Sequence, residues 1–207
     1  EPKFVIDLFG LTAEEAQRRF PDHYQRVLDH VKPERDQNSR QGYRDRWWLF
    51  AEQRSGLRAA TAGLPRYIVT CRTATHRVFQ FVPGTAVVES TVIAITADDA
   101  FALGVLSSRA HVCWATHAGT RLGVGNDPRY NNSLCFEPFP FPTCTDEQKQ
   151  RIRDLGEALD AHRKQRQAEH PDLTITGMYN VLEKLRSGEA PTAKEKVIHE
   201  HGLVSVL

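Results

Sequence analysis

The segment 117–133 holds the side chains of this sequence that are best suited to bind the edges of nucleic-acid bases. Arginine presents paired donors that match guanine, asparagine pairs with adenine, and a carboxylate accepts from the amino group of cytosine. Three glycines in the same segment allow the backbone to approach a bound molecule closely. We predict a base-reading loop here; a polar surface loop without a partner is the alternative. The candidate residues are Arg121, Asn126, Asp127, Arg129, Asn131 and Asn132.

A second polar group lies on the connection between two expected strands. Its members are Arg72, Thr75, His76 and Arg77. Loops carried by a rigid scaffold commonly present binding residues, so we predict further base contacts from this connection. The alternative is an ordinary polar turn of a β-hairpin.

A basic stretch lies further upstream, where six arginines between residues 40 and 66 face only Asp45 and Glu52. Arginines of this kind bind DNA phosphates, which gives affinity without sequence information. A solvated helix face is the alternative interpretation. The predicted phosphate contacts are Arg44, Arg46, Arg54 and Arg58.

We assign no catalytic residue and no metal ligand in this chain. The sequence has no glycine-rich phosphate loop, no G-x-S-x-G, no H-E-x-x-H and no C-x-x-C pattern. His111, Cys113 and His117 lie on or just past one expected helix, but only the last two are about one turn apart. Two ligands do not make a metal site, so we expect these side chains to be structural.

Capping residues, prolines and hydrophobic patterns predict the elements that carry these residues. A capping box of Thr12 and Glu15 opens a helical stretch at 12–31, which Pro21 breaks in two. Further on we expect a linker at 32–42 and a helix at 43–62. Segments rich in Val, Ile, Phe and Thr then predict strands at 67–71, 77–82 and 86–95.

The second half of the chain is expected to be mainly helical. Thr96 is expected to cap a helix that runs to about residue 116, and a short strand is expected at 134–136. The alternating prolines of 137–142 force an extended path. Capping boxes then predict helices at 145–170 and 192–201, with another at 176–186 between them. The fold class is therefore α+β, with a small mixed or antiparallel sheet flanked by helices and an all-helical C-terminal tail.

Composition places the chain among ordinary globular proteins. Of its 207 residues, 40% are hydrophobic and 26% are charged, and the formal net charge is +1. No apolar run approaches the roughly 18 to 20 residues of a membrane span, and we expect no membrane partner. The four scattered cysteines indicate reduced thiols in a cytoplasmic protein. A first residue other than Met suggests a piece of a longer chain.

The tetrapeptide Asp127–Tyr130 resembles the D-P-P-Y motif of adenine-specific DNA methyltransferases. In those enzymes the motif binds the amino group of a flipped adenine, and its aromatic ring stacks on the base. Here Arg129 replaces the second proline, and no strand with a glycine-rich turn for a methyl-donor cofactor precedes the motif. A degenerate methylase built on Asp127–Tyr130 is therefore kept only as an alternative.

A wider resemblance rests on the order and spacing of several short patterns along the chain. These are Trp47-Trp48-Leu49-Phe50, Arg66-Tyr67-Ile68, Thr91–Ile95, Asp98–Phe101, Leu103–Ser108, Trp114, Arg129-Tyr130 and Phe139–Pro142. Together, from about residue 4 to 207, they look like the region that follows the methyltransferase domain in single-chain restriction–modification enzymes of type IIL and related adenine methylases. The segment Phe139–Ile152 is also similar to the end of a recognition domain in type I specificity subunits.

This resemblance implies a helical lead-in at 1–35, a target-recognition domain at 36–143 and a helical C-terminal domain at 144–207. It implies that the chain binds duplex DNA sequence-specifically and positions an adenine for a catalytic domain upstream. That domain, and not this chain, would hold S-adenosylmethionine. In the resembling enzymes, a polar residue and an arginine near the corresponding R-Y element contribute to base choice, and the resemblance implies the same role for Asp127 and Arg129. A module of a phage-defence assembly whose tail binds another protein remains the other alternative.

Overall fold

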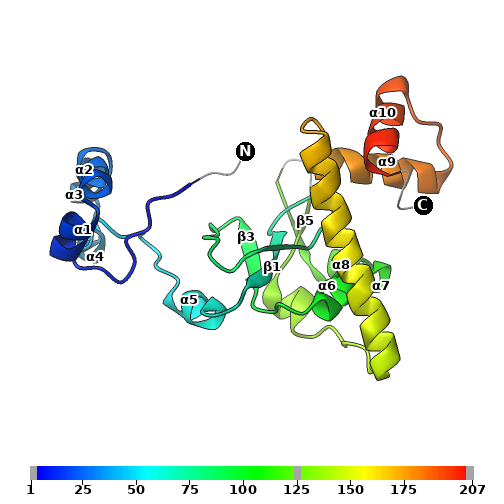
Figure 1. The fold of residues 1–207 in the computed structure, drawn as a ribbon, viewed down its shortest axis with the longest axis horizontal. Coiled ribbons are helices and arrows are strands. Elements are labelled where there is room, and N and C mark those ends of the chain that lie inside the picture. The colour runs from blue at the N-terminus through cyan, green and yellow to red at the C-terminus, as the bar shows by residue number, and fades with distance from the viewer. Residues whose placement is uncertain (1–3, 124–126, 204–207) are drawn as a thin grey trace. The chain divides into compact units, whose positions relative to one another are not determined.

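The computed structural model describes residues 4–123 and 127–203 and divides into two compact units, Glu1–Ala60 and Thr61–Leu207. The first unit is helical, and the second contains the sheets and the C-terminal helices (Figure 1). This combination confirms the α+β class. The predicted domain limits at 35 and 143 stay predictions.

The N-terminal unit begins as its capping residues predict. The Thr12 side chain accepts from the Glu15 amide while the Glu15 carboxylate accepts from the Thr12 amide, so both predicted halves of the capping box are present. Pro21 opens the second helix at its first position, where its missing N–H costs no hydrogen bond. The helices are α1 (Ala13–Arg19), α2 (Pro21–His30), α3 (Lys32–Asp36), α4 (Gln41–Asp45) and α5 (Ser55–Thr61).

The predicted helix at 43–62 is wrong, because only its two ends are helical, as the end of α4 and as α5. The bulky residues between them pack inward in an irregular segment. Trp47 is buried against Tyr24, with ring centroids 5.3 Å apart, and Nε1 of Trp48 donates to the carbonyl oxygen of Leu11 at 3.0 Å. These tertiary contacts override the helical preference of the segment. The predicted linker also contains α3 and the start of α4.

The second unit is built on a three-stranded antiparallel sheet with strand order β2-β1-β3. The strands are β1 (Arg66–Cys71), β2 (Gln80–Pro83) and β3 (Val92–Ile95). The predicted strand 86–95 is therefore correct only at its end. A separate hairpin pairs β4 (Thr120–Leu122) with β5 (Asp127–Arg129).

Two helices follow the sheet where one was predicted. They are α6 (Ala100–Ser107) and α7 (Arg109–Ala118), and Ser108 separates them. Asp99, not Thr96, caps α6, and the Ser108 side chain caps α7 by accepting from the amide of His111. The predicted strand 134–136 is also wrong. It lies in a single π-helical turn, Asn132–Phe136, which buries Cys135.

Close backbone contact joins α6 to the long helix α8 (Asp146–Glu169). A Cβ atom at Gly156 would lie 2.4 Å from the carbonyl oxygen of Ala100, and one at Gly104 would lie 2.7 Å from the side chain of Ile152. Only glycine permits this approach. The core beside this contact includes Ile68, Phe79, Phe81, Leu103 and Leu106.

The C-terminal helices confirm the predicted tail. Capping boxes at Thr145 and Thr192 open α8 and α10 (Ala193–Gly202), and α9 (Ile175–Ser187) lies between them. Figure 1 shows α9 and α10 beside the orange, C-terminal end of α8. Among the helices described, none combines the length and apolar character needed to cross a membrane.

Candidate nucleic-acid interface

The two segments that we predict to read bases lie side by side. The amide of Tyr130 donates to the carbonyl oxygen of Arg72 at 2.7 Å, and the amide of Ala74 donates to that of Pro128 at 3.3 Å. Thr73 and Arg129 also form an isolated antiparallel bridge. The connection after β1 and the β4–β5 hairpin therefore form one composite surface, which we call the reading surface (residues 72–77, 120–123 and 127–131).

Asp127 and Arg129 occupy alternate positions of β5, so their side chains point to the same side of the hairpin. Both are half-buried. Oδ1 of Asp127 accepts from the Thr75 hydroxyl at 3.2 Å, which joins the two segments through side chains as well. Nε of Arg129 is buried and makes no hydrogen bond within the described part of the chain.

A groove with a volume of about 450 Å³ lies beside Asp127. Its walls come from all three strands of the sheet, the connection between β1 and β2, β5 and the start of α9. The residues that line it include Thr73, Thr75, His76, Asp127 and Thr176, and none of the described lining residues is Lys or Arg. The groove therefore offers hydroxyl and carboxylate groups, while the arginines of the reading surface lie outside its lining.

The other candidates of segment 117–133 differ in their surroundings. Arg121 is exposed on β4. Nδ2 of Asn131 donates to the Thr120 hydroxyl at 3.0 Å, so this amide closes the hairpin. Asn126 lies outside the described residues.

Arg72 and His76 make contacts within the protein. Nε of Arg72 donates to the carbonyl oxygen of Ser90 at 2.9 Å. Nε2 of His76 lies 2.6 Å from Oδ1 of Asn180, and its ring packs at a tilt on Tyr179. These contacts hold the connection after β1 in place.

Arg77 is only 8% exposed. Its guanidinium donates to the Thr70 hydroxyl at 3.1 Å, to the carbonyl oxygen of Cys71, and to that of Pro128 at 3.0 Å. Burial lowers the pKa of Arg77, because water stabilises its charge less there. A donor set used in this way does not present itself to a base edge, so we assign Arg77 to the support of the reading surface.

Tyr130 is 1% exposed and packs against Phe79 and His111. Burial raises the pKa of the Tyr130 hydroxyl and lowers the pKa of His111. A ring enclosed in the core cannot stack on an extruded base. This position removes the stacking partner that a methylase built on Asp127–Tyr130 requires.

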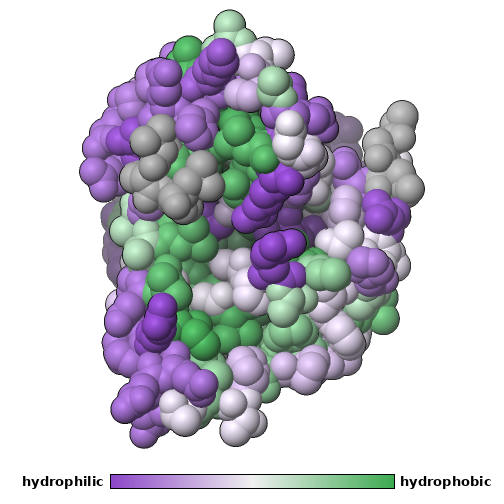
Figure 2. Space-filling view, turned by 90° about the vertical axis from the view of Figure 1, so that its right-hand side faces the viewer, coloured by the Kyte–Doolittle hydropathy of each residue, from purple (hydrophilic) through white to green (hydrophobic). Residues whose placement is uncertain are grey.

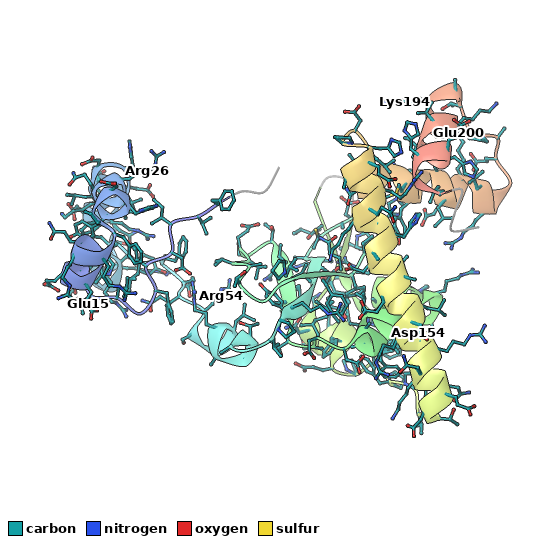
Figure 3. The ribbon with its side chains drawn as sticks, viewed as in Figure 1. Glu15, Arg26, Arg54, Asp154, Lys194 and Glu200 are labelled. Atoms are coloured by element: carbon teal, nitrogen blue, oxygen red, sulfur yellow. The ribbon has the colours of Figure 1, made fainter. Side chains whose placement is uncertain are left out.

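The predicted phosphate contacts all lie in the N-terminal unit or on α5. Nη1 of Arg44 donates to the carbonyl oxygen of Asn38 at 2.5 Å, and Arg58 forms a bidentate ion pair with Asp7 over the ring of Phe9. Arg46 and Arg54 are exposed, and Figure 3 labels Arg54 on the segment that enters α5. The backbone of Arg54 has a φ of 52°, a left-handed conformation. Arg46 and Arg54 are therefore more accessible to a phosphate than Arg44 and Arg58, which form contacts within the protein.

A shallow hollow lies on the outer face of α7. Ala110, Cys113, Trp114, His117 and Ala118 line it. Figure 2 looks onto the side where α7 lies and shows hydrophobic and near-neutral residues gathered there, bordered by hydrophilic ones. Sγ of Cys113 lies 3.8 Å from Nδ1 of His117, and the described residues include no group of three potential metal ligands.

Sequence reasoning missed the supporting residues of the reading surface. His111, Tyr130 and the carbonyl group of Pro128 stabilise it from below, while Asn180 and Glu183 hold it from α9. A histidine and a tyrosine 19 positions apart give no local signal of a contact. In the sequence alone, the polar residues of α9 are typical of a helix face exposed to solvent.

Comparisons with known proteins identify the family and the fold of the chain. Residues 8–143 match a family model described as the target recognition domain of MmeI. The solved structure of the type IIL restriction–modification enzyme MmeI in complex with DNA is similar to 84% of this chain, with a TM-score of 0.59 and 20% identity. The chain spans 22% of the length of that enzyme. No curated protein matches the sequence.

Proposed function

The chain belongs to the family of the MmeI target recognition domain, and from this premise we propose that it reads a short sequence of duplex DNA. The observation that carries the proposal is the joining of residues 72–77 to the β4–β5 hairpin. This joining places the polar side chains of two distant segments on one rigid surface. Residues held rigidly by a scaffold discriminate between bases better than residues on independent loops.

Base choice would come from Asp127 and Arg129. The carboxylate of Asp127 has one oxygen engaged by Thr75 and can accept from the amino group of a base with the other. The guanidinium of Arg129 can donate to guanine. Arg121 on β4 would also contact a base, and Arg46 and Arg54, the exposed members of the predicted phosphate set, would contact phosphates.

Methyl transfer would take place in another domain of a longer protein. The length of the similar MmeI chain leaves room for such a domain. S-adenosylmethionine would bind there, and the chain described here would deliver an adenine to it. The whole protein would then act in restriction–modification, and thus in defence against phage.

A selection experiment tests this proposal. The full-length protein that contains this chain is mixed with a library of randomised duplexes, and the bound DNA is sequenced. We expect enrichment of one short motif, with adenine at a fixed position. An unenriched pool bound with the usual salt dependence would contradict sequence reading, and a pool without bound DNA would contradict DNA binding altogether.

A further inference from the structure

We propose that Arg77 is a positioning residue that sets how Asp127 and Arg129 meet the bases without touching DNA itself. This inference rests on the proposed function, since it concerns how the same surface achieves its selectivity. Arg77 belongs to the connection after β1, whereas Asp127 and Arg129 lie on β5. The argument follows the hydrogen bonds that run between these two segments.

The acceptors of Arg77 come from both segments. Thr70 and Cys71 lie at the end of β1, and Pro128 lies on β5, 51 positions after Arg77. A guanidinium is planar and holds its donors at fixed angles, so it fixes the distance between groups that it bridges. Arg77 therefore helps to set the spacing between the end of β1 and the hairpin, beside the backbone hydrogen bonds that join the two segments.

Pro128 is the residue between the two predicted readers. Its carbonyl oxygen accepts from Nη2 of Arg77 at 3.0 Å and from the amide of Ala74 at 3.3 Å. A proline has no N–H with which to form a further ladder hydrogen bond. Those two hydrogen bonds hold the peptide that links Pro128 to Arg129, on the side of β5 away from its partner strand β4.

The aromatic residues below Arg77 hold it in the same place. Its guanidinium carbon lies 5.2 Å from the centre of the Tyr130 ring, and the hydroxyl of Tyr130 lies 3.2 Å from Nε2 of His111. Nδ1 of His111 lies 2.9 Å from the carbonyl oxygen of Leu106. A carbonyl can only accept, so Nδ1 carries the proton and Nε2 accepts from Tyr130. The support thus continues from the hairpin to α6.

Lysine at position 77 would keep the positive charge but lose the planar set of donors. It could not bridge β1 and Pro128 at the same time with the same geometry. The hairpin would then move relative to the connection 72–77, and Asp127 and Arg129 would lose their alignment with base edges. Contacts with phosphates would be unaffected, because they do not depend on this alignment.

Arg66 provides a matched control for this substitution. Its guanidinium carbon lies 3.7 Å from the centre of the Phe81 ring, and it donates to the carbonyl oxygen of Asp98 and to Glu157. Like Arg77, it combines an aromatic contact with a carbonyl acceptor. Unlike Arg77, it forms no hydrogen bond or ion pair with the described residues of the β4–β5 hairpin. Arg66→Lys therefore reports the general cost of replacing a packed arginine.

The test compares Arg77→Lys and Arg66→Lys in the full-length protein. Binding is measured on the selected duplex, on single-base variants of it and on unrelated DNA. For Arg77→Lys we expect the preference for the selected duplex to fall by about 10-fold or more, with unchanged affinity for unrelated DNA. Arg66→Lys should leave both quantities unchanged. An unchanged preference in Arg77→Lys, or an equal loss on all DNA, would overturn the inference.

Hydrogen exchange in the absence of DNA separates this inference from the proposed function. In Arg77→Lys the amides of Ala74 and Tyr130 should exchange faster, whereas the amides of β3 should not. Unchanged exchange at these two amides would refute the positioning role even for a protein that selects no DNA sequence. Should Arg77→Lys fail to fold, Tyr130→Phe keeps the ring below Arg77 and removes only the hydrogen bond between the Tyr130 hydroxyl and Nε2 of His111. Tyr130→Phe should also lower the preference for the selected duplex and speed amide exchange at Ala74 and Tyr130.

Discussion

Nε2 of His76 lies 2.6 Å from Oδ1 of Asn180, a residue 104 positions later in the chain. Nδ1 of the same ring lies 3.4 Å from a carboxylate oxygen of Glu183, and the side chain of His76 is 7% exposed. Both partners belong to α9, beyond the residues 8–143 that match the recognition-domain family. The C-terminal helices therefore help to hold the reading surface.

Asn180→Ala should loosen the connection after β1. The substitution removes the oxygen that faces His76 while keeping α9 helical, since alanine favours helices. We expect faster amide exchange at residues 72–76 and unchanged exchange in α8. Lys184→Ala, which removes an ion pair with Glu195 on α10, serves as the control and should leave residues 72–76 unchanged. Equal exchange in the two variants would contradict this role of α9.

Under the proposed function, Asp127→Ala and Arg129→Ala should each change or abolish the site that the full-length protein would methylate. A good contact with a base edge contributes about 1–3 kcal/mol of discrimination, so the preference at one base pair should fall by about 10-fold or more. Sequencing of methylated DNA measures the outcome. Arg151→Ala, at an exposed position of α8, is the control. Methylation of the parent site at the wild-type rate in both variants would exclude base reading by this strand.

Arg54→Ala should weaken binding to all DNA sequences alike. A phosphate contact carries no sequence information, and its loss lowers the number of counterions released by about one. The slope of log affinity against log salt concentration should therefore fall by about 1. Fluorescence anisotropy at several salt concentrations gives this slope. A loss confined to the selected duplex would instead place Arg54 among the base-reading residues.

Asp160→Ala should destabilise the second unit. Oδ1 of Asp160 accepts from the amide of Phe81 on the edge strand β2 at 3.0 Å, and its other oxygen pairs with Lys164. Asp160 is 5% exposed, so its loss leaves a buried amide unsatisfied at a cost of about 1–3 kcal/mol. Urea unfolding measures the change. Asp160→Asn keeps an acceptor and should cost less; an equal cost would assign the effect to the charge of Asp160.

Asp99 should make stability depend on pH in the acid range. A hydrogen bond from Arg153 lowers the pKa of Asp99 from 3.8 to about 2, and the same carboxylate caps α6. The carboxylate is charged in the folded protein at pH values where it would be protonated in the unfolded chain. Its contribution is therefore complete above about pH 4 and is lost as the pH falls towards 2.

Asp99→Asn isolates this contribution. Asparagine also caps helices but cannot form the ion pair with Arg153. We expect the difference in melting temperature between the wild type and Asp99→Asn to be present at pH 6 and to vanish near pH 2. A difference that stays constant over this range would show that the charge of Asp99 is not responsible.

Local signals in the sequence predicted most helices and the family correctly. The structure confirms the three helix starts that the capping boxes at Thr12, Thr145 and Thr192 predicted, and the break between helices that Pro21 predicted. Each of these signals involves residues within about one helical turn of one another, so the sequence alone is enough to predict it. The resemblance to type IIL recognition domains is confirmed by the family match over residues 8–143.

Elements whose conformation depends on distant contacts were predicted less well. The segment around Trp47 has a helical pattern, but its indole rings pack on residues of α2 and on the chain before α1. The segment Leu134–Phe136 reads as a strand, yet Cys135 is buried beneath α7 in a π-helical turn. In both cases burial of a side chain outweighs a local preference of about 1 kcal/mol or less per residue.

The sequence by itself determined that a polar loop rich in arginine and asparagine follows the strands of a small sheet, and that capped helices come after it; that this loop contains the β4–β5 hairpin is a result of the structure. Only the tertiary structure decided which of these polar residues face outward. Arg77 and Arg129 were both candidates for base contacts, but the guanidinium of Arg77 donates to Thr70, Cys71 and Pro128, whereas Nε of the half-buried Arg129 makes no hydrogen bond to any described residue. The physical reason is that the direction of a polar side chain depends on acceptors brought from elsewhere in the chain, and folding alone supplies them.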